Sequence, residues 1–69
     1  MEYKYDRLKG KICEKYKTRK AFADAMNLGN TALSFKLNNK SEWSQDEILK
    51  AINLLDLTTD DIKLYFFSH

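Results

Sequence analysis

The sequence contains no proline and only two glycines among its 69 residues. Proline and glycine supply most tight turns, and a chain of short β-strands needs many such turns. Valine is also absent, whereas leucine, lysine and alanine, which favour helices, are frequent. We therefore predict an all-α fold, and the length predicts a single small domain over residues 1–69.

The chemistry-bearing residues are few. Cys13 has no second cysteine with which to form a disulfide, and a metal site would need several cysteine or histidine ligands. Nucleophilic catalysis would need a base beside a nucleophile, and the only histidine is His69. We expect no enzymatic activity, no metal and no cofactor. The chain also leaves no room for a small-molecule ligand domain. Because neither a disulfide nor a metal can stabilise it, the fold must depend on apolar packing.

No segment predicts insertion into a membrane. The longest apolar run is only four residues, at positions 64–67, whereas about 20 are needed to span a bilayer. The basic first residues are not followed by the apolar stretch of a signal peptide. Together with the unpaired cysteine, these features predict a cytoplasmic protein with no membrane partner.

The charge is unevenly distributed although the net charge is only +2. Residues 1–20 carry eight basic and three acidic side chains, a net charge of +5, and residues 42–69 carry two basic and six acidic ones, a net charge of −4. Such an asymmetry favours a polyanion partner on the basic side, although a lysine-rich helix face is more often simply solvated.

Apolar spacing and capping residues predict five helices. Leu8, Ile12 and Tyr16 recur every four residues, as expected for one face of a helix. The strongest start signal is Ser44 followed by Glu47, a capping box. The predicted helices are 6–16 with Asp6 as N-cap, 19–26 capped by Thr18, 30–38, one after Ser44 and one after Thr58. Their short connections predict a compact five-helix bundle.

Residues 18–40 resemble the helix-turn-helix of the lambda-repressor-like, or Cro-type, DNA-binding family. The small Ala23 stands where the two helices cross, and Phe22, Met26, Leu28 and Leu33 match core positions. Lys36 stands where the family usually has an apolar residue. The resemblance implies a sequence-specific, Cro-like phage or prophage transcriptional repressor. It would bind double-stranded operator DNA in the bacterial cytoplasm or a phage-infected cell.

The resemblance also implies roles for individual residues. The third helix would present its amino-terminal end to the major groove, with the second helix and the following loop on the DNA backbone. The implied base-contacting residues are Asn30, Thr31, Ser34 and Phe35. The implied backbone-contacting residues are Arg19, Lys20, Asn38, Asn39, Lys40 and Ser41. For Phe35, packing beneath Trp43 is an equal alternative.

One such domain contacts few base pairs, so the same interpretation expects a homodimer on an inverted repeat. The candidate dimer interface is the apolar run of Leu64, Tyr65, Phe66 and Phe67, because a helix cannot bury four consecutive residues. The alternative is that Phe66 or Phe67 folds back onto the first helix.

A second hypothesis belongs to a different functional class. The same bundle could be a protein-interaction module, such as an antitoxin or an antirepressor. Its acidic carboxy-terminal third and aromatic end would then form the working surface.

Overall fold

A computed structural model describes residues 3–68, and this part of the chain contains helices but no strands. The α-helices are α1 (Asp6–Tyr16), α2 (Arg19–Met26), α3 (Asn30–Leu37), α4 (Gln45–Leu54) and α5 (Ile62–Phe66). A 3-10 turn, η1 (Thr59–Asp61), directly precedes α5. The predicted all-α bundle of five helices is therefore confirmed.

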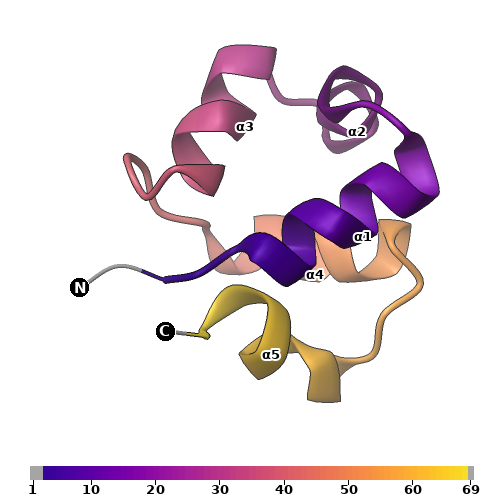
Figure 1. Ribbon diagram of the computed structural model, residues 1–69, viewed down its shortest axis with the longest axis vertical. Coiled ribbons are helices and arrows are strands. Elements are labelled where there is room, and N and C mark those ends of the chain that lie inside the picture. Colours follow the sequence, from indigo (N-terminus) through magenta and orange to yellow (C-terminus); the bar gives the residue numbers. More distant parts are fainter. Residues whose placement is uncertain (1–2, 69) are drawn as a thin grey trace.

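The helices pack around one core (Figure 1). Helix α1 lies in front of α4, α2 and α3 lie at one end of the molecule, and α5 lies at the other (Figure 1). The beginning and end of the described chain lie side by side, because the Lys4 backbone N–H donates to the Ser68 carbonyl at 2.7 Å. The amino-terminal segment is thus anchored beside α5.

Most helix starts follow the predicted caps. The Thr18 hydroxyl accepts from the Ala21 N–H at 3.1 Å. At α4 the Ser44 hydroxyl accepts from the Glu47 N–H at 3.1 Å, and the Glu47 carboxylate accepts from the Ser44 N–H at 2.8 Å. Thr58 forms a second capping box with Asp61. These caps satisfy backbone donors that the first turn leaves unpaired.

Helix α1 has the predicted bounds, but its predicted cap is wrong. Asp6 is the first residue of α1 and Tyr5 is its N-cap, without a side-chain hydrogen bond. The buried Tyr5 packs into the core, so tertiary packing and not a side-chain cap positions the start of this helix. Helix α3 ends at Leu37, with Asn38 as its C-cap. The following Asn39 adopts a left-handed conformation with a φ of 60°, which reverses the chain.

The core draws buried side chains from all five helices and from the loop before α1. Its largest fully buried members are Phe22, Phe66, Leu8, Ile12, Leu33, Leu37 and Leu55. Ala23 and Ala51 are also fully covered, so no larger side chain fits there without displacing its neighbours. The apolar stripe predicted for residues 6–16 and the core positions predicted for α2 and α3 thus meet in one cluster.

Lys36 is buried in α3, where its exposed fraction is only 8%. Its ammonium lies 3.0 Å from the Glu47 carboxylate and donates to the Glu42 carbonyl at 2.9 Å. A buried charge is tolerated only when it is paired and hydrogen-bonded, and both conditions are met here. The ion pair therefore ties the end of α3 to the start of α4 and fixes the loop between them.

Stability should depend on the ionisation of Glu47. Burial raises the pKa of this carboxyl, but hydrogen bonds from Ser44 and Lys36 lower the pKa more, so it lies below its usual value of 4.5. Because the pKa of Glu47 is lowered by folding, its ionised carboxylate stabilises the folded state at pH values above 4.5. This stabilisation is lost as the pH falls through the lowered pKa. Urea denaturation at a series of pH values should show this loss, and Glu47→Gln should flatten the curve. An equally steep curve for the variant would contradict the prediction.

Candidate functional site

The first candidate surface is the face of α2 and α3 for which the sequence predicted DNA contact. Asn30 and Thr31 are exposed at the start of α3, and Phe35 is 48% exposed one turn later. Phe35 therefore does not pack into the core beneath Trp43, whose ring contacts are with Tyr5 and Phe66.

Several of the predicted contact residues on this face have intramolecular partners. The Lys20 ammonium pairs with the Asp24 carboxylate at 3.3 Å, and the Asn38 amide donates to the Ser34 hydroxyl at 3.3 Å. Arg19, Lys40 and Ser41 are exposed. The face thus brings together most of the predicted residues, but not as a set of free polar groups.

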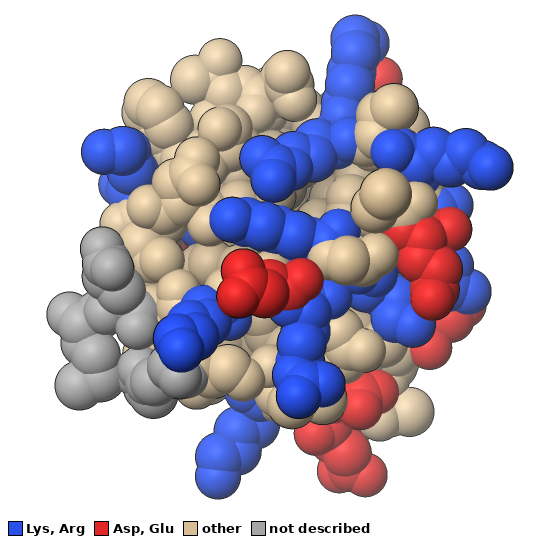
Figure 2. Space-filling view, viewed as in Figure 1, with Lys and Arg blue, Asp and Glu red and all other residues tan. Residues whose placement is uncertain are grey.

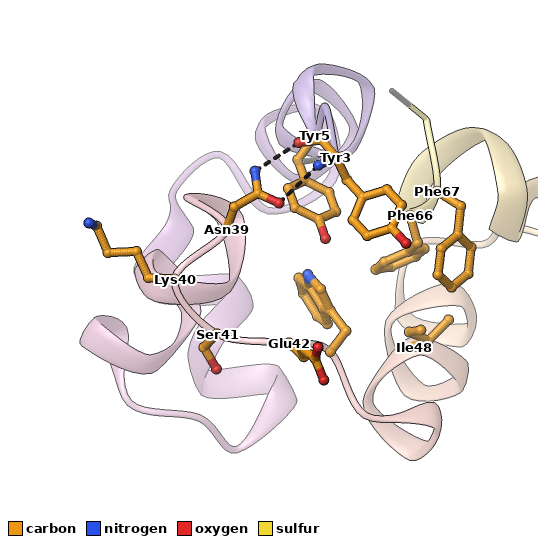
Figure 3. Close-up of a pocket in the computed structure, with 10 residues that line it drawn as sticks. Tyr3, Tyr5, Asn39, Lys40, Ser41, Glu42, Ile48, Phe66 and Phe67 are labelled. Carbon is orange, nitrogen blue, oxygen red and sulfur yellow. Dashed lines mark hydrogen bonds between the residues drawn. The ribbon is translucent and has the colours of Figure 1, made fainter. Parts of the chain in front are cut away.

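Asn39 has a structural role that the sequence did not indicate. Its amide accepts from the Tyr3 N–H at 3.0 Å and donates to the Tyr3 carbonyl at 2.8 Å (Figure 3). This pair of hydrogen bonds resembles the pairing of two backbone strands. It fastens the amino-terminal segment to the loop that follows α3.

An aromatic hollow of about 400 Å³ lies between that loop, the amino-terminal segment and the end of α5 (Figure 3). Trp43 contributes to its wall and packs edge-on against Phe66, with ring centroids 5.1 Å apart. Phe67 packs edge-on against Tyr3 at 5.5 Å. Burial raises the pKa of Tyr5, and the neighbouring Tyr3 raises it further. Within residues 3–68, the buried Trp43 Nε1 has no hydrogen-bond acceptor.

The second candidate surface is the face shared by α4 and α5. Leu49 on α4, Leu64 on α5 and Phe67 at the end of α5 are each more than 40% exposed. Two further hollows, of about 390 and 370 Å³, lie along this face, and Phe67 contributes to both. Exposed apolar side chains beside hollows are typical of protein contact surfaces.

The four residues of the predicted dimer interface, 64–67, differ in their exposure to solvent. Leu64 and Phe67 are exposed, Tyr65 is half-buried, and Phe66 is only 1% exposed. Phe66 is therefore a core residue, and its assignment to an interface is wrong. The physical reason is that α5 packs against α1 and α4, and Phe66 is the residue that its orientation turns inward. The alternative prediction, that Phe66 or Phe67 folds back onto the first helix, therefore fits Phe66.

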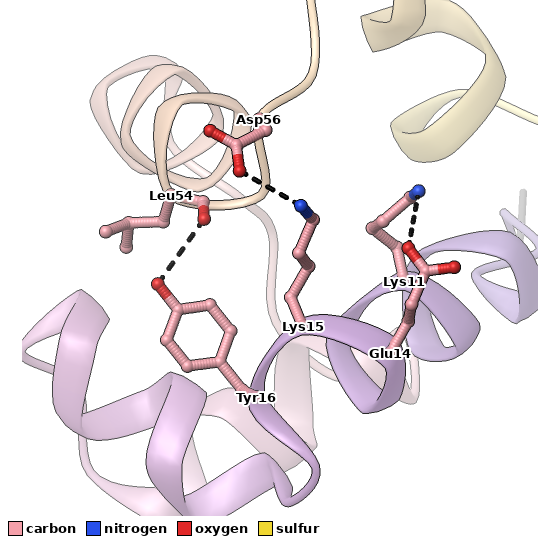
Figure 4. Close-up of polar contacts among 6 residues, drawn as sticks. All are labelled: Lys11, Glu14, Lys15, Tyr16, Leu54 and Asp56. Carbon is pink, nitrogen blue, oxygen red and sulfur yellow. Dashed lines mark hydrogen bonds and ion pairs between the residues drawn. The ribbon is translucent and has the colours of Figure 1, made fainter.

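Basic and acidic side chains are also unevenly distributed over the surface of the folded protein. Lys and Arg side chains spread over the face that α1 forms, and acidic ones lie mainly along the right and lower right of this view, with one near its centre (Figure 2). One pair of opposite charges is the Lys15 ammonium, which lies 3.0 Å from the Asp56 carboxylate (Figure 4). Beside it the Tyr16 hydroxyl donates to the Leu54 carbonyl at 3.4 Å (Figure 4). These contacts join α1 to the end of α4.

Residues 3–68 hold no group of three or more cysteine, histidine or acidic side chains arranged to bind a metal ion. None of their helices has the length and apolar character needed to cross a bilayer. His69 lies outside the described residues.

A family model described as a protein of unknown function, DUF739, matches residues 1–69. The chain is also similar to the solution structure of the modulator of repression of the temperate bacteriophage TP901-1 from Lactococcus lactis. The two sequences are 51% identical, the TM-score is 0.84, and the match covers 97% of this chain and 90% of that chain. A comparison with curated proteins found no match.

These comparisons correct the functional prediction from the sequence. The matched family is DUF739, and the similar structure is a modulator of repression, not a Cro-type repressor. The predictions of a Cro-like DNA-binding repressor, of operator DNA as partner and of a homodimer on that DNA are therefore wrong. The DNA-contact roles of residues on α2, α3 and the following loop came only from that resemblance, so they are not carried forward.

The error has a physical cause. Phe22, Ala23 and Leu33, which carried much of the resemblance, are all buried. Such residues determine how two helices cross, and any protein with the same crossing needs similar ones. Packing residues therefore predicted the arrangement of the helices correctly, but a fold does not imply a function.

Proposed function

The chain belongs to the DUF739 family, and from its likeness to a phage modulator we propose that it regulates a phage repressor by binding the repressor protein. The observation that carries the proposal is 51% identity to the TP901-1 modulator of repression over 97% of this chain. This proposal agrees with the protein-interaction hypothesis drawn from the sequence.

The surface of the molecule supports a protein partner. The α4 and α5 helices present exposed leucine and phenylalanine side chains beside two hollows. The same third of the sequence carries a net charge of −4, which disfavours contact with DNA phosphates. We propose that the protein acts in the bacterial cytoplasm, where phage operators are bound, and that it acts by association, without catalysis.

The proposal predicts direct binding to a repressor. Purified protein should bind the purified TP901-1 repressor in isothermal titration calorimetry with a Kd of about 1 μM or tighter. In a gel-shift assay it should change the fraction of operator DNA that the repressor holds. Without the repressor, it should leave the mobility of the operator fragment unchanged.

Two results would contradict this function. One is an absence of heat of binding together with an unchanged operator fraction at protein concentrations well above 1 μM. The other is a sequence-specific shift of DNA by this protein alone. A scrambled duplex of the same length and the heat-denatured protein are the controls.

A further inference from the structure

The exposed apolar side chains of α4 and α5 lie around one residue, Phe67. Phe67 contributes to the hollow that Gln45, Leu49 and Ile62 line and to the hollow that Asp60 and Leu64 line. Its own exposed fraction is 43%. An exposed aromatic ring that lines two hollows can be covered by apolar side chains that enter them. The apolar face of an amphipathic helix supplies such side chains.

Two aspartates lie near the exposed leucines of this face, as their positions along the sequence show. Asp46 and Leu49 are three residues apart on α4, so they lie on the same side of the helix. Asp60 precedes Leu64 by four residues and contributes to the same hollow. Among the residues that the structure describes, neither Asp46 nor Asp60 takes part in an ion pair. Their carboxylates are therefore available to a basic partner.

Two of the three nearby lysines are engaged elsewhere. The Lys36 ammonium is paired with Glu47, and the Lys50 ammonium donates to the Met26 carbonyl at 3.2 Å, towards α2. Lys63 lines the same hollow as Asp60 and offsets part of its charge. The face is thus apolar in its middle, and its edges carry two carboxylates, Asp46 and Asp60, against the one ammonium of Lys63.

We propose that this α4–α5 face binds an amphipathic, basic helix on the surface of the repressor. The apolar side of that helix would cover Phe67 and enter the two hollows, and its lysine or arginine residues would pair with Asp46 and Asp60. The inference rests on the proposed function, because it identifies where the repressor binds and with which chemistry. Defined by residues, the α4–α5 face comprises Asp46, Leu49, Asp60, Ile62, Lys63, Leu64 and Phe67.

The competing surface on α3 lacks the same features. Phe35 is as exposed as Phe67, but it contributes to none of the three hollows described above. Its neighbours Asn30, Thr31 and Ser34 are polar and uncharged. Phe35 therefore serves as a matched control, since it is a phenylalanine of similar exposure on a different face.

The test is calorimetric titration of the TP901-1 repressor into four variants, each first checked by circular dichroism. Phe67→Ala should weaken binding about 30-fold and Leu49→Ala about 10-fold, as expected for central apolar contacts. The double change of Asp46→Lys and Asp60→Lys should weaken binding about 10-fold at low salt and less at 0.5 M salt. Phe35→Ala should stay within about twofold of the unchanged protein.

Leu49→Ala keeps the test decisive if Phe67→Ala loses structure, because Leu49 lies on a different helix and lacks the contact of Phe67 with Tyr3. Tight binding by Leu49→Ala and by the lysine variant, together with weak binding by Phe35→Ala, would overturn this inference and leave the proposed function intact. An absence of repressor binding by the unchanged protein would overturn the proposed function itself, and this inference with it.

Discussion

Replacing Phe66 by alanine should remove much of the protein's stability at room temperature. Phe66 is 1% exposed and packs edge-on against Trp43, and α5 contacts both α1 and α4. Truncating a buried phenylalanine costs about 3–5 kcal/mol. A domain of this size has a total stability of only roughly 3–10 kcal/mol. The loss should therefore consume much of the free energy of unfolding, as urea denaturation followed by circular dichroism would report.

The neighbouring Phe67 provides the control for this experiment. The two residues have the same side chain and adjacent positions, but Phe67 is 43% exposed. Phe67→Ala should cost only about 1 kcal/mol, which includes the loss of its edge-on contact with Tyr3. Equal destabilisation by the two changes would contradict the orientation of α5 described above.

Replacing Glu47 by alanine should destabilise the protein by about 2–4 kcal/mol. The change removes half of a capping box, which is worth about 1 kcal/mol, and it leaves the Lys36 ammonium without its partner in a buried position. The loss stays below the full penalty of an unpaired buried charge because Lys36 keeps its hydrogen bond to the Glu42 carbonyl. Urea denaturation at neutral pH measures the cost.

A second substitution separates the two contributions. Lys36→Met removes the buried charge and retains most of the side-chain volume, so the double variant Lys36→Met with Glu47→Ala should regain about 1–2 kcal/mol over Glu47→Ala alone. A double variant as unstable as Glu47→Ala would mean that the lost cap accounts for the whole effect and that the ion pair contributes nothing.

The helices were predictable because their signals are local. Ser44 and Glu47 cap α4 from three residues apart, and Thr58 and Asp61 do the same before α5. Asn27 ends α2 in a left-handed conformation with a φ of 61°, as its side chain allows. Such interactions form within one turn of chain, so neighbouring residue types suffice to predict them.

The proposed contact surface was only partly predictable. The protein-interaction hypothesis pointed to the acidic carboxy-terminal third and its aromatic end, but it could not separate exposed from buried residues there. It also missed Leu49, which looks like any other helix residue in the sequence. The capping box had identified Glu47, yet its pairing with Lys36 joins residues eleven positions apart on two helices. The one sign of such a partner in the sequence was Lys36, which stands where the resembled family usually has an apolar residue.

By itself, the sequence determined the all-helical class, the capped starts of α2 and α4 and the two apolar stripes that pack α2 against α3. Each depends on contacts within a few residues or on side-chain volume. The tertiary structure decided which of Phe66 and Phe67 is buried, why Lys36 can be buried, and how Leu49, Leu64 and Phe67 come to share one face. Those outcomes depend on how α5 lies against α1 and α4, an arrangement that no short stretch of sequence contains.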